Sequence, residues 1–233
     1  MIKNIYKATS HQLADKGWVQ IASHFKETGT PMCQSFGKLV SCDDIIVQPA
    51  GRGFGMHSHS NMEIVTILFS GLLAHEGGIG RNVQLTPISV QAISSGTGVL
   101  HNEYNPSDDE HAHLIQLWFQ PDQQNVMPTY EYKNIRPQDI LNRWCLLVNE
   151  HQKEDSLSIN QAISISLAVL TEDTVYVRHN DSNGIYIIVI EGEIGIADEQ
   201  LTAKDAIALH AYPSLALTVT ETAKVLVVET PVY

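Results

Sequence analysis

The stretches GRGFGMHSHSNMEIV, residues 51–65, and SGTGVLHNEYN, residues 95–105, decide both the fold and the candidate site. The first contains His57 and His59, and the second contains His101 and Glu103. Successive side chains of a β-strand point to opposite faces, so the two members of each pair share one face. Imidazoles and a carboxylate suit a divalent first-row metal. If a sheet brings the two pairs together, they form a metal site.

The composition and the charge of the chain narrow the classes of partner. The chain has 233 residues, of which 43% are hydrophobic and 17% are charged, enough for one large or two small domains with a buried core. Its formal net charge is −12, and its Lys and Arg residues are scattered without forming a run. This balance argues against direct binding to nucleic acid or to an anionic membrane surface.

The N-terminal segment and the cysteines indicate the cellular compartment. Residues 1–19 lack the apolar segment of a signal peptide, and no later stretch approaches the ~20 apolar residues that a membrane-spanning helix needs. Cys33, Cys42 and Cys145 are odd in number and show no CxxC spacing, so we expect free structural thiols rather than disulfides or a thiolate zinc site. We therefore expect a cytoplasmic protein.

Short apolar segments separated by Gly, Pro, Asn and Asp predict a chain that is nearly all strand. Regularly spaced strands of this kind favour a sandwich or a barrel, and such sheets often enclose a ligand at their mouth. The predicted strands cover residues 36–48, 64–73, 113–119, 163–170, 184–196 and 224–230.

Two similar halves follow one another along the chain. The segments IVTILFSGLLAH (residues 64–75) and IYIIVIEGEIGI (185–196) both predict a strand, a glycine turn and a strand, with Gly71 matching Gly192. LTPISVQAIS (85–94) likewise resembles LTAKDAIALH (201–210). The polar segment 121–137, with three prolines, predicts the connection between the halves. We place an N-terminal metal-binding domain at residues 1–128 and a C-terminal domain at residues 129–233.

The second half lacks the candidate ligands. The two alignments above carry the four ligand positions onto residues that offer neither an imidazole nor a carboxylate. These residues are Arg178, Asn180, Leu217 and Val219. The sequence therefore predicts one metal ion per chain, in the N-terminal half.

The residues around the two pairs are similar to the two motifs of the cupin superfamily, small β-barrels that hold a metal between two hairpins. The motifs are Gly51-x5-His57-x-His59-x3-Glu63 followed by Gly71, and Gly98-x2-His101-x3-Asn105. Within that superfamily, GFGMHSHSNMEIVTILFSG (53–71), GTGVLHNEYNPS (96–107) and HLIQLWFQP (113–121) resemble the pirin family. The resemblance is strong from residue 43 to residue 121 and weaker from residue 156 to the end.

This resemblance implies an all-β bicupin, with two tandem cupin β-barrels of the double-stranded β-helix or jelly-roll type. It implies one metal, usually Fe²⁺ with Ni²⁺, Mn²⁺, Cu²⁺ or Zn²⁺ as alternatives, bound by His57, His59, His101 and Glu103, and a C-terminal barrel without ligands. Pirin-like proteins include some that open the flavonol quercetin with molecular oxygen, whereas the animal pirins are nuclear iron proteins that regulate transcription.

Glu63 is an alternative to Glu103 as the acidic ligand. Glu63 has the strand parity of the first histidine pair and is the acidic ligand in many cupins, whereas the resemblance to pirins favours Glu103. Glu63 would then accept an imidazole N–H from a ligand, or be a paired acid. His75, just beyond the hairpin glycine, could also reach the pocket.

Functions from different classes remain open at this point. As an enzyme, the protein would bind a small aromatic substrate at the metal and react it with O₂, with Glu103 as the catalytic base. As a regulator, it would use the redox state of an iron to control a surface for a protein partner, without turnover. A binding protein for a small metabolite is a third possibility. We favour an oxidoreductase that resembles quercetin 2,3-dioxygenase.

Overall fold

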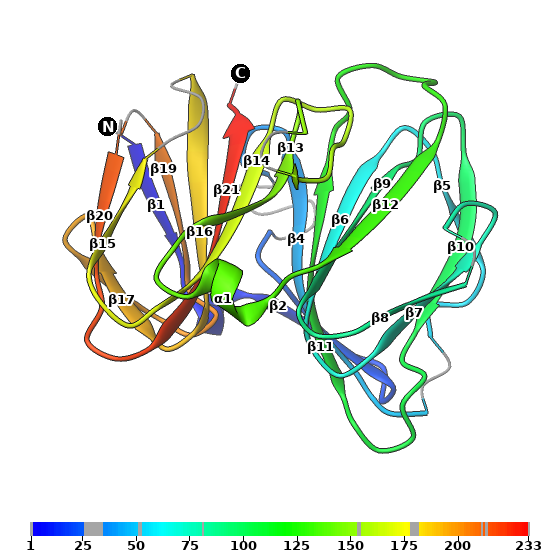
Figure 1. The fold of residues 1–233 in the computed structure, drawn as a ribbon, viewed down its shortest axis with the longest axis horizontal. Helices are drawn as coiled ribbons and strands as arrows, with labels where there is room; N and C mark the ends of the chain where they lie inside the picture. The colour runs from blue at the N-terminus through cyan, green and yellow to red at the C-terminus, as the bar shows by residue number, and fades with distance from the viewer. Residues whose placement is uncertain are drawn as a thin grey trace.

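The computed structural model shows two β-barrels side by side (Figure 1). It describes residues 2–25, 35–50, 53–80, 82–152, 155–177, 182–210, 212 and 214–232. Within these ranges the helical elements are a 3-10 helix, Ala8–Ser10, and the α-helix α1, Pro137–Ile140. None of the helices in the described part of the chain has the length and apolar character needed to cross a membrane. The predicted all-β fold is confirmed.

The N-terminal barrel consists of a seven-stranded sheet and a four-stranded sheet, both antiparallel. The large sheet has the order β12 (Thr129–Asn134), β9 (Ser89–Ser94), β6 (Glu63–Ser70), β11 (Ala112–Phe119), β4 (Leu39–Val47), β3 (Val19–Ser23) and β2 (Gln12–Asp15). The small sheet has the order β5 (His57–His59), β10 (Val99–Tyr104), β7 (Leu73–Gly77) and β8 (Val83–Leu85).

The C-terminal barrel repeats this arrangement. Its six-stranded sheet has the order β1 (Ile2–Tyr6), β19 (Ala206–His210), β16 (Asn183–Glu191), β21 (Ala223–Pro231), β14 (Ser164–Leu170) and β13 (Cys145–Asn149). Its small sheet has the order β15 (Thr174–Val177), β20 (Ser214–Thr218), β17 (Glu193–Ile196) and β18 (Glu199–Thr202). The order β15-β20-β17-β18 corresponds to β5-β10-β7-β8, so the internal repeat read from the sequence is a repeat of topology.

Edge strands are exchanged across the predicted boundary. Strand β1, from the start of the chain, pairs with β19 of the C-terminal barrel. Strand β12 lies within the segment 121–137, which we expected to be a connection, yet it pairs with β9 of the N-terminal sheet. The sequence did not reveal this strand because β12 is polar and partly exposed and has no apolar run. The division into domains 1–128 and 129–233 stays a prediction, although strand pairing crosses it.

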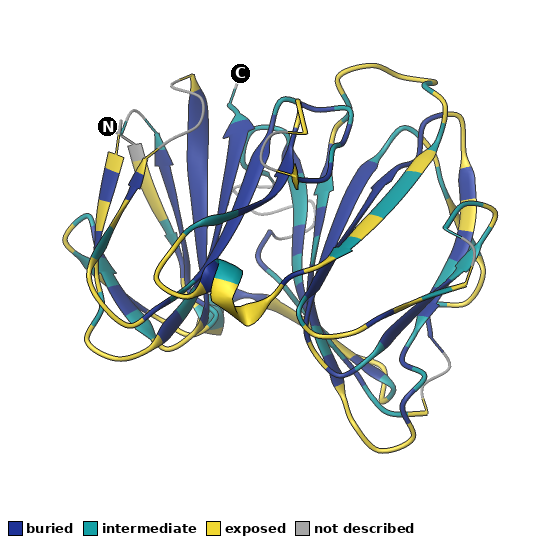
Figure 2. Ribbon diagram, in the orientation of Figure 1, coloured by how far each residue is buried: buried dark blue, intermediate teal, exposed yellow. Residues whose placement is uncertain are grey.

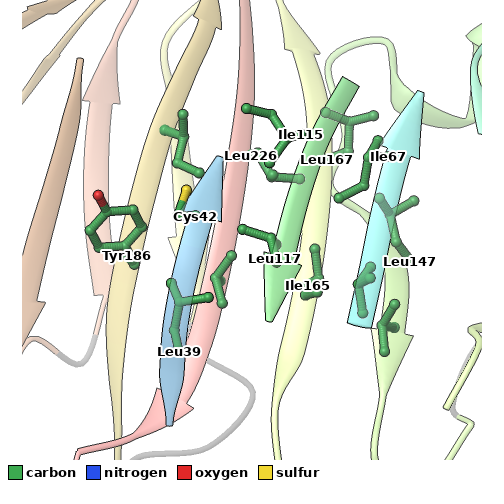
Figure 3. Packing of buried hydrophobic residues seen from close by; sticks show 14 of the residues in the cluster. Leu39, Cys42, Ile67, Ile115, Leu117, Leu147, Ile165, Leu167, Tyr186 and Leu226 are labelled. Carbon is green, nitrogen blue, oxygen red and sulfur yellow. The ribbon is translucent and has the colours of Figure 1, made fainter. Parts of the chain in front are cut away.

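The two large sheets face each other and share one apolar core (Figure 3). Ile67, Ile115 and Leu117 of the N-terminal sheet belong to the same buried cluster as Ile165 and Leu226 of the C-terminal sheet. The strands in the middle of the molecule are accordingly the most deeply buried (Figure 2). Because burial of apolar surface is the main driving force of folding, we expect this core, rather than a metal, to hold the barrels together.

One of the three cysteines can be assigned from the structure. Cys42 is a buried, free thiol on β4, and burial raises its pKa well above the usual range. A thiol of this kind is structural and unreactive. Cys33 lies outside the described residues, so the prediction made for it is not addressed.

Gly71 and Gly192 occupy the matching hairpin turns of the two barrels. Both have positive φ, +73° and +80°, and a Cβ on Gly71 would lie 2.1 Å from the carbonyl oxygen of His111. We expect Gly71→Ala to lower the free energy of unfolding by more than the ~1–2 kcal/mol that a left-handed conformation alone costs. Gly17→Ala is the control, because Gly17 has φ +80° but open space around it. Equal losses in urea unfolding of the two variants would show that the close approach is unimportant.

His11 and His24 form a buried pair where the two barrels meet. Their rings stack with centroids 4.0 Å apart, and the His24 Nδ1 lies 2.9 Å from the hydroxyl of Tyr186 on β16. Burial lowers the pKa of His24 to about 3, with a further contribution from His11, and burial also lowers the pKa of His11. Asp44 raises and Lys204 lowers the pKa of both rings, and Asp205 also raises the pKa of His11.

This pair predicts destabilisation by acid. Between pH ~6.5 and the folded pKa of about 3, the unfolded chain binds a proton at His24 that the native protein does not. Stability therefore falls as the pH falls through this window, by ~1.4 kcal/mol per pH unit for one such proton. We expect His24→Gln to reduce the slope of unfolding free energy against pH by about one proton. An unchanged slope in His24→Gln would contradict this assignment.

Candidate metal centre

Three adjacent strands of the small N-terminal sheet, at the right of Figure 1, direct five candidate ligands to one volume. His57 and His59 lie on β5, and His101 on β10 pairs directly with His57. Glu103, two residues further along β10, pairs directly with His75 on β7. Residues directly opposite each other in an antiparallel ladder have their side chains on the same face. Strand parity and register together therefore place the two sequence pairs on one face of the small sheet. That the four residues bind one metal ion stays a prediction.

Glycines permit the close packing of backbone around β10. A Cβ on Gly77 would lie 2.4 Å from the Leu100 carbonyl oxygen and 2.9 Å from the His101 Cα. Gly53, with φ +66°, also lies close to β10, because a Cβ added to it would be 2.5 Å from the carbonyl oxygen of Glu103. Gly53 and Gly77 are therefore positions at which the absence of a side chain lets the backbone approach the ligand strand closely.

His57, His59 and His101 form a compact triad. One ligand atom from each lies within 4.8 Å of the other two, and the ring centroids are 4.5–5.0 Å apart. The Nδ1 of His57 lies 2.8 Å from the carbonyl oxygen of Gly55. Since a carbonyl can only accept, Nδ1 carries the proton and Nε2 keeps its lone pair for a ligand. This is the usual arrangement of a metal-binding histidine.

Burial keeps imidazoles of this triad neutral. It lowers the pKa of His59 to about 4, helped by the neighbouring His57. It lowers the pKa of His101 to about 3, helped by His57, His75 and His59. Neutral imidazole is the form that binds a metal, so His59 and His101 are ready to bind one at neutral pH.

A hydrogen-bond network holds the buried carboxylate of Glu103. The side-chain amides of Gln91 and Gln116 donate to its two oxygens, the second at 2.9 Å. The Tyr130 hydroxyl donates to the Gln91 Oε1, and the Trp118 Nε1 donates to the Gln116 Oε1, each at 3.0 Å. These outer bonds fix which way each amide faces. Burial raises the pKa of Glu103, and the two amides partly oppose that rise.

The sequence analysis did not identify Gln91, Gln116 or Tyr130 as parts of the site. The glutamine within the strand segment SVQAIS is a signal that could have been used. Gln91 is fully buried there, and a buried amide needs hydrogen-bond partners. Tyr130 had no such signal, since it lies on β12, the edge strand that the sequence did not reveal.

Glu63 lies apart from the centre. It is on β6 of the large sheet, fully buried, and accepts hydrogen bonds from the Ser94 hydroxyl at 2.8 Å and the Asn160 backbone N–H at 2.9 Å. Neither donor is an imidazole, so of the two roles left open for Glu63 these bonds do not support acceptance of an imidazole N–H and leave that of a paired acid. Glu63 instead links the N-terminal sheet to the loop before β14.

His75 lies beside His101 and Glu103. Its Nε2 donates to the Ile79 carbonyl oxygen at 3.2 Å, and its ring packs against Tyr130 with centroids 4.6 Å apart. It forms a second triad with His101 and Glu103, whose ligand atoms also lie within 4.8 Å of one another.

The buried nitrogens of this centre fit a divalent transition metal. Both ring nitrogens of His101 and the Nδ1 of His75 are buried and have no hydrogen-bond partner among the described residues. Buried polar atoms are normally satisfied, so these nitrogens call for a ligand, and imidazole with carboxylate suits Fe, Ni, Cu or Zn.

The C-terminal barrel presents a different interior. Its corresponding small sheet buries apolar and aromatic side chains where the N-terminal sheet has ligands. These side chains are Tyr176, Ile194, Ile196, Leu215 and Leu217. Within the part of the chain that the structure describes, both candidate metal triads lie in the N-terminal barrel.

Comparison with known proteins gives consistent similarities along the whole chain. The family model Pirin matches residues 6–119, and the model of the quercetinase C-terminal cupin domain matches residues 146–230. A quercetin 2,3-dioxygenase of Escherichia coli K12 is 27% identical over 228 residues, which is 97% of each chain. A putative quercetin 2,3-dioxygenase of Zymomonas mobilis is 28% identical over 99% of this chain and 98% of its own.

One solved structure bears on the metal. The crystal structure of the bacterial pirin YhhW from Escherichia coli, in complex with nickel(II), has a TM-score of 0.91 to this chain, with 25% identity and coverage of 100% of both chains. The similarity therefore extends over both barrels and over the strand order that forms the centre.

Proposed function

Because this chain belongs to the pirin family of bicupins, we propose that it is a metal-dependent dioxygenase that opens a flavonol such as quercetin with O₂. The observation that supports this most directly is the cluster of buried histidines beside the buried carboxylate of Glu103. Relatives of full length carry the name quercetin 2,3-dioxygenase, and the substrate class of this chain is inferred from them.

In this proposal His57, His59, His101 and Glu103 hold one divalent ion. Fe²⁺ is the ion that the family resemblance favours, and a relative binds nickel(II), so Ni²⁺ is the next candidate, with Mn²⁺, Cu²⁺ and Zn²⁺ after it. When bound, such an ion supplies Lewis acidity toward a substrate hydroxyl and, if redox-active, electron exchange with O₂. The protein supplies orientation and the handling of the proton.

Glu103 is the group that would accept the proton of a substrate hydroxyl. Burial raises its pKa, which brings a carboxylate closer to the basicity that general-base catalysis requires. Gln91 and Gln116 hold its two oxygens in place, so little reorganisation is needed when the proton moves. An aromatic hydroxyl, which is acidic compared with an alcohol, suits this base.

Aromatic side chains flank His57 and His59. The Trp118 ring packs edge-on against the His59 ring, with ring centroids 5.1 Å apart. The ring centroids of Phe54 and His57 are 6.4 Å apart. Flat apolar surfaces beside a polar centre are suited to a planar aromatic substrate. The acidic balance of the chain supports a small-molecule substrate over direct binding of nucleic acid.

Oxygen uptake tests this proposal. The protein is reconstituted separately with Fe²⁺, Ni²⁺, Mn²⁺ and Cu²⁺, and O₂ consumption is recorded with quercetin, with a catechol and without substrate. We expect uptake that requires both the metal and the flavonol, with metal-free protein as the control. If no fully loaded form consumes O₂ with any flavonol or catechol, a redox-sensing regulator or a metabolite-binding protein takes the place of the enzyme.

A further inference from the structure

His75 has the features of a metal ligand, although the proposed function does not use it. Its side chain is 1% exposed, and the bond from its Nε2 to the Ile79 carbonyl leaves Nδ1 as the nitrogen with a lone pair. That Nδ1 is buried and has no hydrogen-bond partner in the described part of the chain. His57 is arranged in the same way through Gly55. A backbone carbonyl that fixes the tautomer is the usual outer contact of a ligating histidine.

The position of His75 places it on the inner side of the centre. It lies directly opposite Glu103 in the β7–β10 ladder. Glu103 and His101 are, like His75, almost fully buried, at 3% and 1% exposure, whereas His57 and His59 on the edge strand β5 are only half-buried. The Tyr130 ring packs against the His75 ring and limits its rotation.

We propose that the centre offers one divalent ion two overlapping positions, an outer one formed by His57, His59 and His101, and an inner one formed by His75, His101 and Glu103. This inference rests on the proposed metal site and deepens it. Because His101 belongs to both triads, a single ion occupies one position or the other. In the outer position Glu103 is the fourth ligand of the proposed function, held by two amides. In the inner position Glu103 binds the ion together with His75 and His101.

The two triads can be separated by mutation, with Ni²⁺ as the probe. The double variant His57→Ala/His59→Ala removes two outer ligands and leaves the inner triad whole. We expect wild-type protein to bind one Ni²⁺ per chain and the double variant to bind one Ni²⁺ per chain more weakly. Adding His75→Leu to the double variant should then remove Ni²⁺ binding. Titration calorimetry and metal analysis after gel filtration measure all three, with circular dichroism to check the fold.

A second measurement needs no change at His75. Nitrogen hyperfine coupling in the electron paramagnetic resonance spectrum of the Cu²⁺-loaded double variant should show two imidazoles, those of His75 and His101. One imidazole, or none, would overturn the inner position even if the triple variant did not fold.

The outcomes distinguish the inference from the proposal on which it rests. If wild-type protein binds no Ni²⁺, both the metal site and the inner position fail. If wild-type protein binds Ni²⁺ but the double variant does not, only the inner position fails. If the triple variant binds Ni²⁺ as well as the double variant does, His75 is not a ligand.

Discussion

His101→Ala should abolish tight metal binding while the protein remains folded. His101 belongs to both candidate triads, so its loss leaves neither set complete. Since changes to groups that merely support ligands cost 10–100-fold in metal affinity, loss of this shared ligand should cost more than ~100-fold. The fold should survive because none of the candidate ligands belongs to the apolar core clusters of the described residues. Titration with Fe²⁺ or Ni²⁺ measures the first effect, and thermal unfolding of the metal-free protein measures the second.

The matched control for this variant is His151→Ala. The His151 side chain is 66% exposed, its Nε2 lies 2.9 Å from the Glu150 Oε1, and it is far along the chain from the centre. It should bind metal as the wild type does. Global unfolding of His101→Ala without metal would show that this residue has a structural role, and retention of wild-type affinity would remove it from the ligand set.

Glu103→Gln should reduce turnover of a flavonol by ~10²-fold or more, the usual contribution of a general base. An amide oxygen remains a weak donor to a metal, so we expect much of the metal to be retained. The amide cannot take up a proton, and its NH₂ group would face one of the two donors, Gln91 or Gln116, that now serve the carboxylate. The turnover number with quercetin, measured at equal metal occupancy, is the relevant quantity.

Glu63→Gln provides the control for the loss of a buried carboxylate as such. Glu63 is as deeply buried as Glu103, and burial raises the pKa of both, but its donors are Ser94 and Asn160. We expect this variant to keep its turnover at a given metal occupancy. A Glu103→Gln variant with full turnover would mean that another group accepts the proton. Equal losses in the two variants would point to a general effect on folding.

Local periodicity was sufficient for a large part of the fold and the site. The i, i+2 spacing placed His57 with His59 and His101 with Glu103 on common strand faces, because that rule depends only on the pleat of each strand. The matching hairpins around Gly71 and Gly192 revealed the repeat because each half must bury the same apolar pattern around the same turn. The absence of ligands from the second half followed from the same alignment.

Other features depended on which strands become neighbours, and local periodicity carries no information about that. Glu63 shares the parity of the first histidine pair, but β6 belongs to the large sheet, so its carboxylate pairs with Ser94 and Asn160 instead of an imidazole. Gln91 and Tyr130 reach the centre because β9 and β12 pair with each other beside it. Only the antiparallel register of β7 and β10 sets His75 directly opposite Glu103 and creates a second triad. Such contacts arise from long-range strand pairing. The free energy of that pairing is shared among many residues of the sheet, so it cannot be predicted from any one segment of the sequence.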